Sequence, residues 1–229
     1  MKLSTALVAA AAAVCAVGGG VMVFDGLASG GQEAPSVTGG YSFDPVAGVS
    51  PAPVPSTRVV IDGGRAAQVG DGLVARFEPS LLQIPSLGVS AQIVDVPLED
   101  GVLEIPAPSK VGRWDGGAQP GDLAGTMLLA GHVSGRGVKG ALYPLSTIGQ
   151  GAEILVSDSR GCYLEQYRVV GLEQIHKQDL PAELFAEDGE RLLRVITCGG
   201  QVITRSDGSR HYEDNVIVTA ALSHIWDGC

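Results

Sequence analysis

The sequence is poor in aromatic and charged residues, and it has few cysteines. Of its 229 residues, 5% are aromatic and 17% are charged, and 4 are cysteine. So few aromatic side chains argue against a surface that stacks nucleic-acid bases. Lysine and arginine total 15 against 25 aspartate and glutamate residues, for a formal charge of −10. This excess of acid argues against nucleic acid or an anionic lipid surface as the main partner, because both need clustered cations.

The sequence also lacks the ligand spacing of a metal site. No two cysteines and no two histidines stand at the short intervals, about two to five residues, that structural zinc sites use. The acidic stretch from Glu183 to Glu190 does not have the ligand spacing of a calcium loop. We therefore expect neither a metal nor a cofactor, and we expect His176, His211 and His224 at the surface or at an interface.

A long apolar run lies near the N-terminus. No charged residue occurs from Leu3 to Phe24, with Lys2 before the run and Asp25 after it. As a helix this run would be about 33 Å long, enough to cross the hydrocarbon core of a bilayer. We predict that residues 1–25 form a transmembrane signal anchor in the cell membrane, with the rest of the chain outside the cell. A cleaved signal peptide is the alternative.

Two regions of different composition follow the apolar run. Residues 26–75 are rich in Gly, Pro, Ser and Ala without a sustained period, which predicts a flexible linker. In residues 76–224 short β-type runs alternate with turn signals, which predicts a barrel or sandwich that is mainly β, with its first firm strand at Ser80–Ile84. Residues 225–229 are expected to be a tail.

Within the β domain, two kinds of segment stand out. The uniformly apolar runs TMLLAG and LLRVIT are typical of central strands buried on both faces. Short helices are predicted within residues 139–148 and 180–189. Cys162 is expected to be a half-buried strand residue, with a redox pairing to Cys198 as a minor alternative, and Cys229 to lie in a mobile end.

Both apolar strands end in residues that could carry chemistry. His132 follows TMLLAG, and Cys198 ends its strand directly before Gly199 and Gly200. A cysteine nucleophile needs thiolate character and an electropositive neighbour, which a histidine can supply. Adjacent glycines let backbone N–H groups approach a substrate carbonyl, as an oxyanion hole requires. These residues alone do not exclude the alternative that the cysteine and the histidine have only a structural role in packing.

Five phrases in order resemble the sortases, which are cysteine transpeptidases of the Gram-positive surface. These are LLQIPSLGVSAQIVDVPLEDGVLEIP, VGRWDGGAQPGDLAGTMLLAGHV, LYPLSTIGQGAEILV, VITCGG and HYEDNVIVTA. Among the classes of sortase, the sequence most resembles the actinobacterial class F type. The resemblance covers about Ser80 to Ala221 and implies a closed β-barrel of about eight strands with short connecting helices.

The resemblance implies a reaction and its residues. Cys198 would cleave an LPXTG-like sorting signal between Thr and Gly and hold the peptide as a thioester. An amine of peptidoglycan, or of its lipid-linked precursor, would then release it. His132 would act as general acid and then as general base. The protein is expected to be a monomer.

The resemblance also implies an arginine that stabilises the oxyanion and orients the peptide. Arg210, directly before the HYEDNVIV strand, is the favoured residue, with Arg205 as the alternative. Thr197, Gly199 and Ser134 are expected to contact the substrate.

Three other functions compete with this one. A cysteine peptidase would use the same residues with water as the acceptor. In an exported β-barrel binding module, Cys198 would be a packing residue without a catalytic role. An L,D-transpeptidase is disfavoured, because that family has a His and a Gly just before its Cys, whereas this sequence reads VITCGG.

Overall fold

The computed structural model describes Pro35, Val37 and residues 76–99, 101–135, 137–206, 208 and 210–229. The predicted anchor at 1–25 lies outside these residues, as does the predicted linker at 26–75 apart from Pro35 and Val37. Within the described part of the chain, no helix has the length and apolar character needed to cross a membrane.

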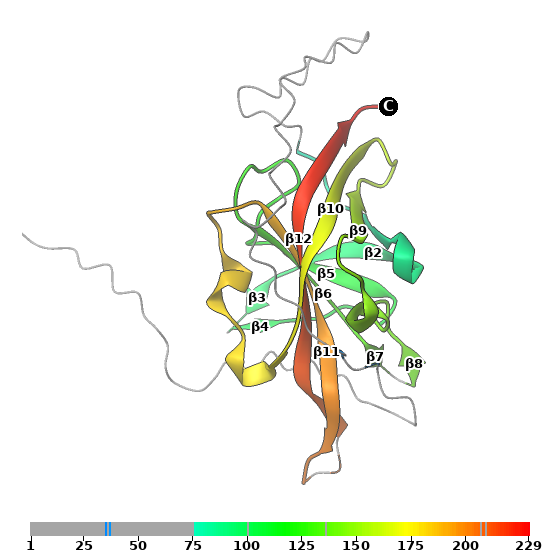
Figure 1. Ribbon diagram of the computed structural model, residues 1–229, viewed down its shortest axis with the longest axis vertical. Coiled ribbons are helices and arrows are strands. Elements are labelled where there is room, and N and C mark those ends of the chain that lie inside the picture. The colour runs from blue at the N-terminus through cyan, green and yellow to red at the C-terminus, as the bar shows by residue number, and fades with distance from the viewer. Residues whose placement is uncertain are drawn as a thin grey trace, which may run out of the picture.

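The described chain folds around a closed barrel whose strands follow the order β1-β2-β5-β6-β11-β12-β10-β9 (Figure 1). Pairing of β1 with both β2 and β9 closes the barrel. The closed barrel and the first strand confirm the predictions from the sequence. The strands are β1 Leu81–Ile84, β2 Val89–Val96, β5 Lys110–Trp114, β6 Thr126–Gly131, β9 Glu153–Ser157, β10 Tyr163–His176, β11 Leu192–Thr204 and β12 Arg210–Asp227.

Short elements connect the barrel strands. The two helices predicted within 139–148 and 180–189 are single 3₁₀ turns, since Pro144 and Pro181 precede them and segments of about ten residues are marginal as helices. The connecting elements are η1 Pro85–Leu87, β3 Leu98–Glu99, β4 Val102–Leu103, β7 Ser134–Gly135, β8 Val138–Lys139, η2 Leu145–Thr147, η3 Lys177–Asp179 and η4 Ala182–Phe185.

Two apolar clusters stabilise the domain, one inside the barrel and one on its outer surface. The inner cluster takes side chains from all of the barrel strands, for example Leu82, Leu129 and Val218. The outer cluster lies over β6, β11 and β12 and includes Leu128, Cys198 and, from η4, Leu184. Every residue of β6 is buried because its two faces contact different clusters, which confirms the prediction that this strand is buried on both faces.

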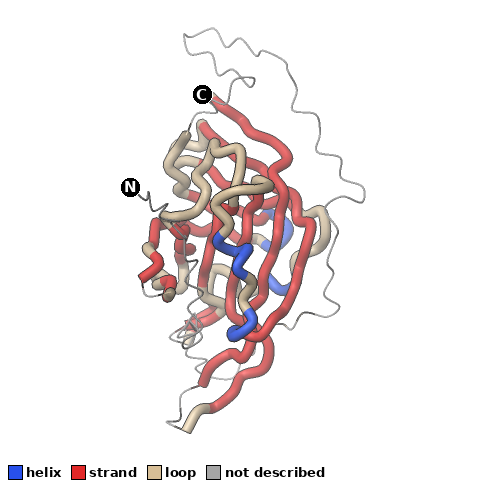
Figure 2. Tube along the Cα trace, turned by 90° about the vertical axis from the view of Figure 1, so that its left-hand side faces the viewer, coloured by secondary structure: helices blue, strands red, loops and turns tan. Residues whose placement is uncertain are grey.

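The longest strands, β10, β11 and β12, run side by side, and the hairpin of β11 and β12 extends beyond the other strands (Figures 1 and 2). The hairpin ends where Thr204 pairs with Arg210. A register shift between Gly199 and Val202 marks the place where this hairpin leaves the barrel.

Three predictions about single residues are wrong. Cys162 and Cys229 form a disulfide, because the pairing of Tyr163 with Asp227 at the end of β10 and β12 brings their neighbours together. Cys198 is the free cysteine among the described residues. His211 of β12 is buried rather than on the surface, although Ile203, its partner on β11, is exposed.

Candidate active site

The parallel pairing of β6 with β11 determines where the two candidate catalytic residues lie. Ala130 of β6 pairs with Ile196 of β11, and both strands run toward the same edge of the barrel. The same register, continued by two residues, places Cys198 alongside His132. Between them the Thr197 hydroxyl donates a hydrogen bond of 2.7 Å to the carbonyl of Gly131. Residues far apart in the sequence are therefore neighbours at one edge of the sheet.

The backbone of His132 is held from one side by the segment after β8. Leu142 donates to the His132 carbonyl at 3.2 Å, and a Cβ on Gly140 would lie 2.0 Å from that oxygen. Only glycine at position 140 allows this approach. The histidine therefore sits on a fixed backbone while its side chain remains half-buried.

The environment of the His132 ring favours its neutral form. Burial lowers the pKa of the imidazole from 6.5, although hydrogen bonds to the backbone of Ile105 and Pro106 act to raise it. Pro106 has no N–H, so its carbonyl is the acceptor, and Nδ1 is buried with no hydrogen-bond partner in the described part of the chain.

Cys198 lies in the outer cluster with 2% of its surface exposed. Burial raises the pKa of its thiol to about 11, although the nearby charge of Lys177 and a hydrogen bond from that side chain act to lower it. Because the pKa of His132 is lowered while that of Cys198 is raised, the thiolate and the imidazolium together are a minor form of the site. The neutral thiol and the neutral imidazole are the resting forms.

A row of residues crosses the three long strands at the level of the thiol. Asn215 of β12 pairs with Cys198 on one side and with Ile175 of β10 on the other. Directly opposed residues of antiparallel strands point to the same face, with Cβ atoms about 5 Å apart. Asn215 is fully buried, and neither its Nδ2 nor its Oδ1 has a hydrogen-bond partner among the described residues. An unpaired amide therefore lies beside the sulfur.

The two glycines after Cys198 are required by packing. A Cβ on Gly199 would lie 2.5 Å from Cγ2 of Val216. Gly200 has a φ of 74°, and a Cβ there would lie 2.2 Å from Oδ2 of Asp214. Both glycines thus let β11 lie close against β12 beside the nucleophile.

The two candidate arginines lie in the hairpin beyond the barrel. Arg210 pairs with Thr204 and is five residues before Asn215, roughly 17 Å along β12. Arg205 is exposed in the turn. Neither side chain makes a hydrogen bond or an ion pair with another described residue. The register therefore places neither arginine next to the sulfur, and the part that Arg210 plays in catalysis stays a prediction.

The predicted substrate contacts lie around the same edge. The Thr197 hydroxyl is used for the bond to Gly131, so only the backbone of this residue is free to meet a ligand. Ser134 is half-buried on β7, with its Oγ 3.5 Å from the hydroxyl of Tyr212. The substrate contacts of Thr197, Gly199 and Ser134 stay predictions.

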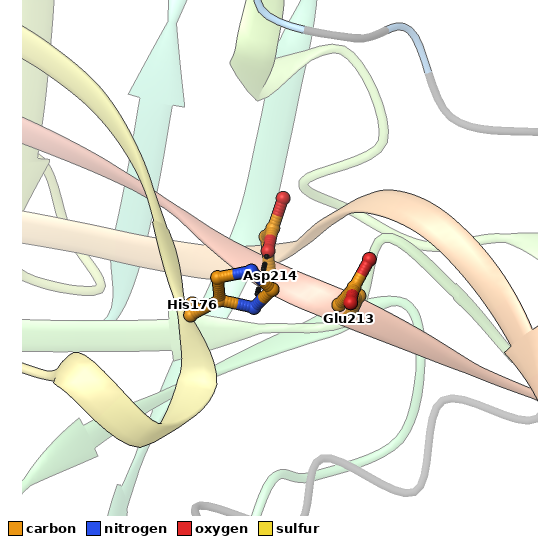
Figure 3. A group of neighbouring side chains, drawn as sticks. All are labelled: His176, Glu213 and Asp214. Atoms are coloured by element: carbon orange, nitrogen blue, oxygen red, sulfur yellow. Dashed lines mark ion pairs between the residues drawn. The ribbon is translucent and has the colours of Figure 1, made fainter.

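Sequence spacing did not reveal a polar group on the opposite face of β12. His176 pairs with Asp214 across β10 and β12, and their Nδ1 and Oδ1 atoms lie 3.1 Å apart (Figure 3). Gln174 donates to the same carboxylate at 2.7 Å. Together with Glu213, His176 and Asp214 offer three possible metal-ligand atoms within 4.8 Å of one another. The ion pair and the hydrogen bond account for the arrangement of His176 and Asp214 without an ion.

Sequence reasoning missed Lys177 and Asn215. Lys177 stands between a strand and a 3₁₀ turn, and Asn215 within a strand, so neither belongs to a recognisable motif. Only the pairing of β10, β11 and β12 shows that both residues flank Cys198.

The Sortase domain model matches residues 82–223. Among 67 matching chains of known structure are sortase C-1 and the sortase SrtA, both from Actinomyces oris. Sortase C-1 is 19% identical with a TM-score of 0.49, and the match covers 62% of this chain and 72% of that one. SrtA is 18% identical with a TM-score of 0.49, and the match covers 69% of this chain and 89% of that one.

No curated protein matches the chain. The class F subtype stays a prediction, since the domain model identifies only the family. The family model spans more than half of the sequence, with His132 and Cys198 inside the matched region. The chain therefore belongs to the sortase family, a family of cysteine transpeptidases.

Proposed function

We propose that this sortase cleaves an LPXTG-like sorting signal between Thr and Gly and transfers the acyl group to an amine of the cell wall or of its precursor. The observation that carries the proposal is the parallel register of β6 and β11, which brings His132 and Cys198 together at one edge of the barrel. The family membership supplies the reaction class.

The residues would act in two steps. The Cys198 thiolate attacks the threonine carbonyl, and a C–S bond forms. The C–N bond to glycine then breaks while protonated His132 gives its proton to the leaving amine. In the second step the acceptor amine attacks the thioester, its proton passes to His132, and the Cys198 thiolate leaves. The protonation states return to their starting forms.

Arg210 is proposed to orient the peptide at a distance from the sulfur. An extended peptide of five residues spans roughly 17 Å, which is about the length of strand between Asn215 and Arg210. A sorting signal bound along this hairpin would reach from Cys198 to the guanidinium. Arg210→Ala is then expected to raise KM for the peptide more than it lowers kcat, with Arg205→Ala as the matched control.

The proposed place of action is outside the cell, with residues 1–25 as the membrane anchor. The disulfide between Cys162 and Cys229 supports export, because such bonds persist in oxidising compartments. The apolar run from Leu3 to Phe24 supports the anchor.

The test incubates the full chain with an LPXTG-type peptide, with and without triglycine. We expect an amide product with triglycine and no cleavage by Cys198→Ala. Equal hydrolysis with and without triglycine would identify a peptidase that uses water instead. Unchanged cleavage by Cys198→Ala would remove the catalytic role of Cys198.

A further inference from the structure

The charged and polar groups that face Cys198 come from three elements. His132 follows β6, Asn215 lies on β12, and Lys177 follows β10. Lys177 is the one cationic side chain of these three, since burial favours the neutral ring of His132. Glu213, two residues before Asn215 on β12, places a carboxylate on the same face of the strand. Arg210 lies five residues before Asn215 on β12, and Arg205 lies in the turn before that strand, so both are away from the row that contains the sulfur.

The strand register explains why Lys177 reaches the sulfur. Ile175, Asn215 and Cys198 form one row across β10, β12 and β11, with their side chains on the same face. Side chains alternate along a strand, so His176 projects to the face opposite Ile175. Lys177 is the first residue of η3 and lies two residues beyond Ile175, at the end of this row. The flexible stem of Lys177 brings its ammonium to the thiol, with which it forms a hydrogen bond.

The opposite face holds Lys177 in this register. His176 contacts the carboxylate of Asp214 (Figure 3). Gln174 donates a hydrogen bond to the same carboxylate, and together these contacts fix the end of β10 against β12 directly before Lys177. η3 begins at Lys177, so the chain turns away immediately after it. The lysine is thus placed by a fixed strand end and not by a free loop.

We propose that Lys177, rather than an arginine, is the cation that stabilises the Cys198 thiolate, and that the Asn215 amide completes this anion site as a neutral donor. The inference rests on the proposed function, because it assigns a step of that reaction. A cation beside the sulfur favours the attacking thiolate, and a donor amide beside it can bind the oxyanion of the tetrahedral intermediate.

The experiment compares two alkylating reagents of similar size, anionic iodoacetate and neutral iodoacetamide. The full chain is used, and modification is measured on the tryptic peptide 195–205, which contains Cys198. The ratio of the two rates reports the local charge, while access to the buried sulfur affects both reagents alike. We expect Lys177→Met to lower the iodoacetate-to-iodoacetamide ratio by about fivefold or more, because a fixed cation is lost.

Two variants serve as controls. Lys177→Arg keeps the charge and is expected to hold the ratio within about twofold of the wild-type value. Arg168→Met removes an exposed cation that pairs with Glu153 on β9, away from Cys198, and should leave the ratio unchanged. A ratio for Lys177→Met within about twofold of wild type would overturn the proposal. An equally lowered iodoacetate-to-iodoacetamide ratio in Lys177→Arg would also overturn the proposal, since the charge at position 177 would then not be the cause.

The outcome is separable from the test of the proposed function. Alkylation needs neither a sorting signal nor an acceptor amine, so a charge effect of Lys177 can be found even if the peptide is not cleaved. If Cys198 in Lys177→Met is alkylated with the wild-type ratio of rates while the wild-type chain cleaves the peptide, the proposed function stands and only the role of Lys177 fails.

Discussion

At the scale of single residues, the site combines a thiol and an imidazole whose pKa values lie far apart. Burial raises the pKa of Cys198 to about 11 and lowers that of His132 below 6.5. The reactive state holds a thiolate and an imidazolium, each of which is the minor form at neutral pH. The fraction of this state is constant between the two pKa values and falls outside them.

The first prediction concerns the pH dependence of peptide cleavage. Below the pKa of His132 the resting site holds an imidazolium and a neutral thiol, and the thiol must lose its proton to reach the reactive state. We therefore expect kcat/KM to fall about tenfold for each pH unit below that pKa. Between pH 7 and about 10 it should stay level, because the loss of imidazolium offsets the gain of thiolate. Measuring kcat/KM from pH 5 to 10 checks this. A steady rise through pH 7 to 9 would show that protonated His132 is not needed.

The second prediction concerns the unpaired amide of Asn215. Asn215→Leu keeps the volume but removes the donor, so kcat is expected to fall about 10²-fold with little change in KM. Its free energy of unfolding should not fall, because a buried amide with no partner costs stability. Thr219→Val, further along β12, is the control and should keep its kcat. Full activity of Asn215→Leu would contradict a role for the amide.

At the scale of elements, a buried charged network joins β10 to the start of β11. Glu165 of β10 is fully buried and accepts hydrogen bonds from Tyr167, from the backbone of Gly121 and, at 3.2 Å, from Arg191. Arg191 also donates to the carbonyl of Gln119 at 3.2 Å. The network fixes the loop before β6 against β10, and β6 leads directly to His132. Its integrity therefore supports the alignment of β6 with β11.

The third prediction tests this network. Glu165→Gln leaves the charge of Arg191 buried without a counter-charge, and we expect a loss of about 3 kcal/mol in the free energy of unfolding. Glu153→Gln is the matched control, since its pair with Arg168 is exposed and should contribute less than about 1 kcal/mol. Urea denaturation of the full chain gives both values. Equal losses in the two variants would show that burial of the pair is not decisive.

At the scale of the whole molecule, the disulfide joins the start of β10 to the chain after β12. Cys162 and Cys229 are 67 residues apart in sequence, and the loop between them contains β10, β11 and β12. A covalent link across these strands restricts the unfolded chain more than the folded one. The strand that carries Cys198 and the two strands that carry Asn215 and Ile175 all lie within this loop.

The fourth prediction follows from that loop. The double variant Cys162→Ser/Cys229→Ser should lose about 2–4 kcal/mol in the free energy of unfolding. Mass spectrometry of the denatured chain should show that Cys162 and Cys229 react with iodoacetamide only after reduction. Modification of both residues without reduction would show that the bond is not formed in the isolated protein.

The class of the fold and the kind of chemistry could be predicted from the amino-acid sequence alone. Alternating and uniformly apolar runs predict β-strands because burial depends on which side chains face the core, and that pattern is local. The contexts of His132 and Cys198 at strand ends carried the resemblance to sortases. The two expected helices fell within short segments bounded by proline, where local propensity does not decide the structure.

Only the tertiary structure decided which groups meet at the sulfur. Strand order and register are set by long-range pairing, so the contacts of Cys198 with Lys177 and Asn215 could not be read from spacing along the chain. The disulfide and the buried position of His211 depend on the same pairing of β12 with its neighbours. A barrel brings together residues from distant strands because closure, and not sequence proximity, satisfies the backbone hydrogen bonds of every strand.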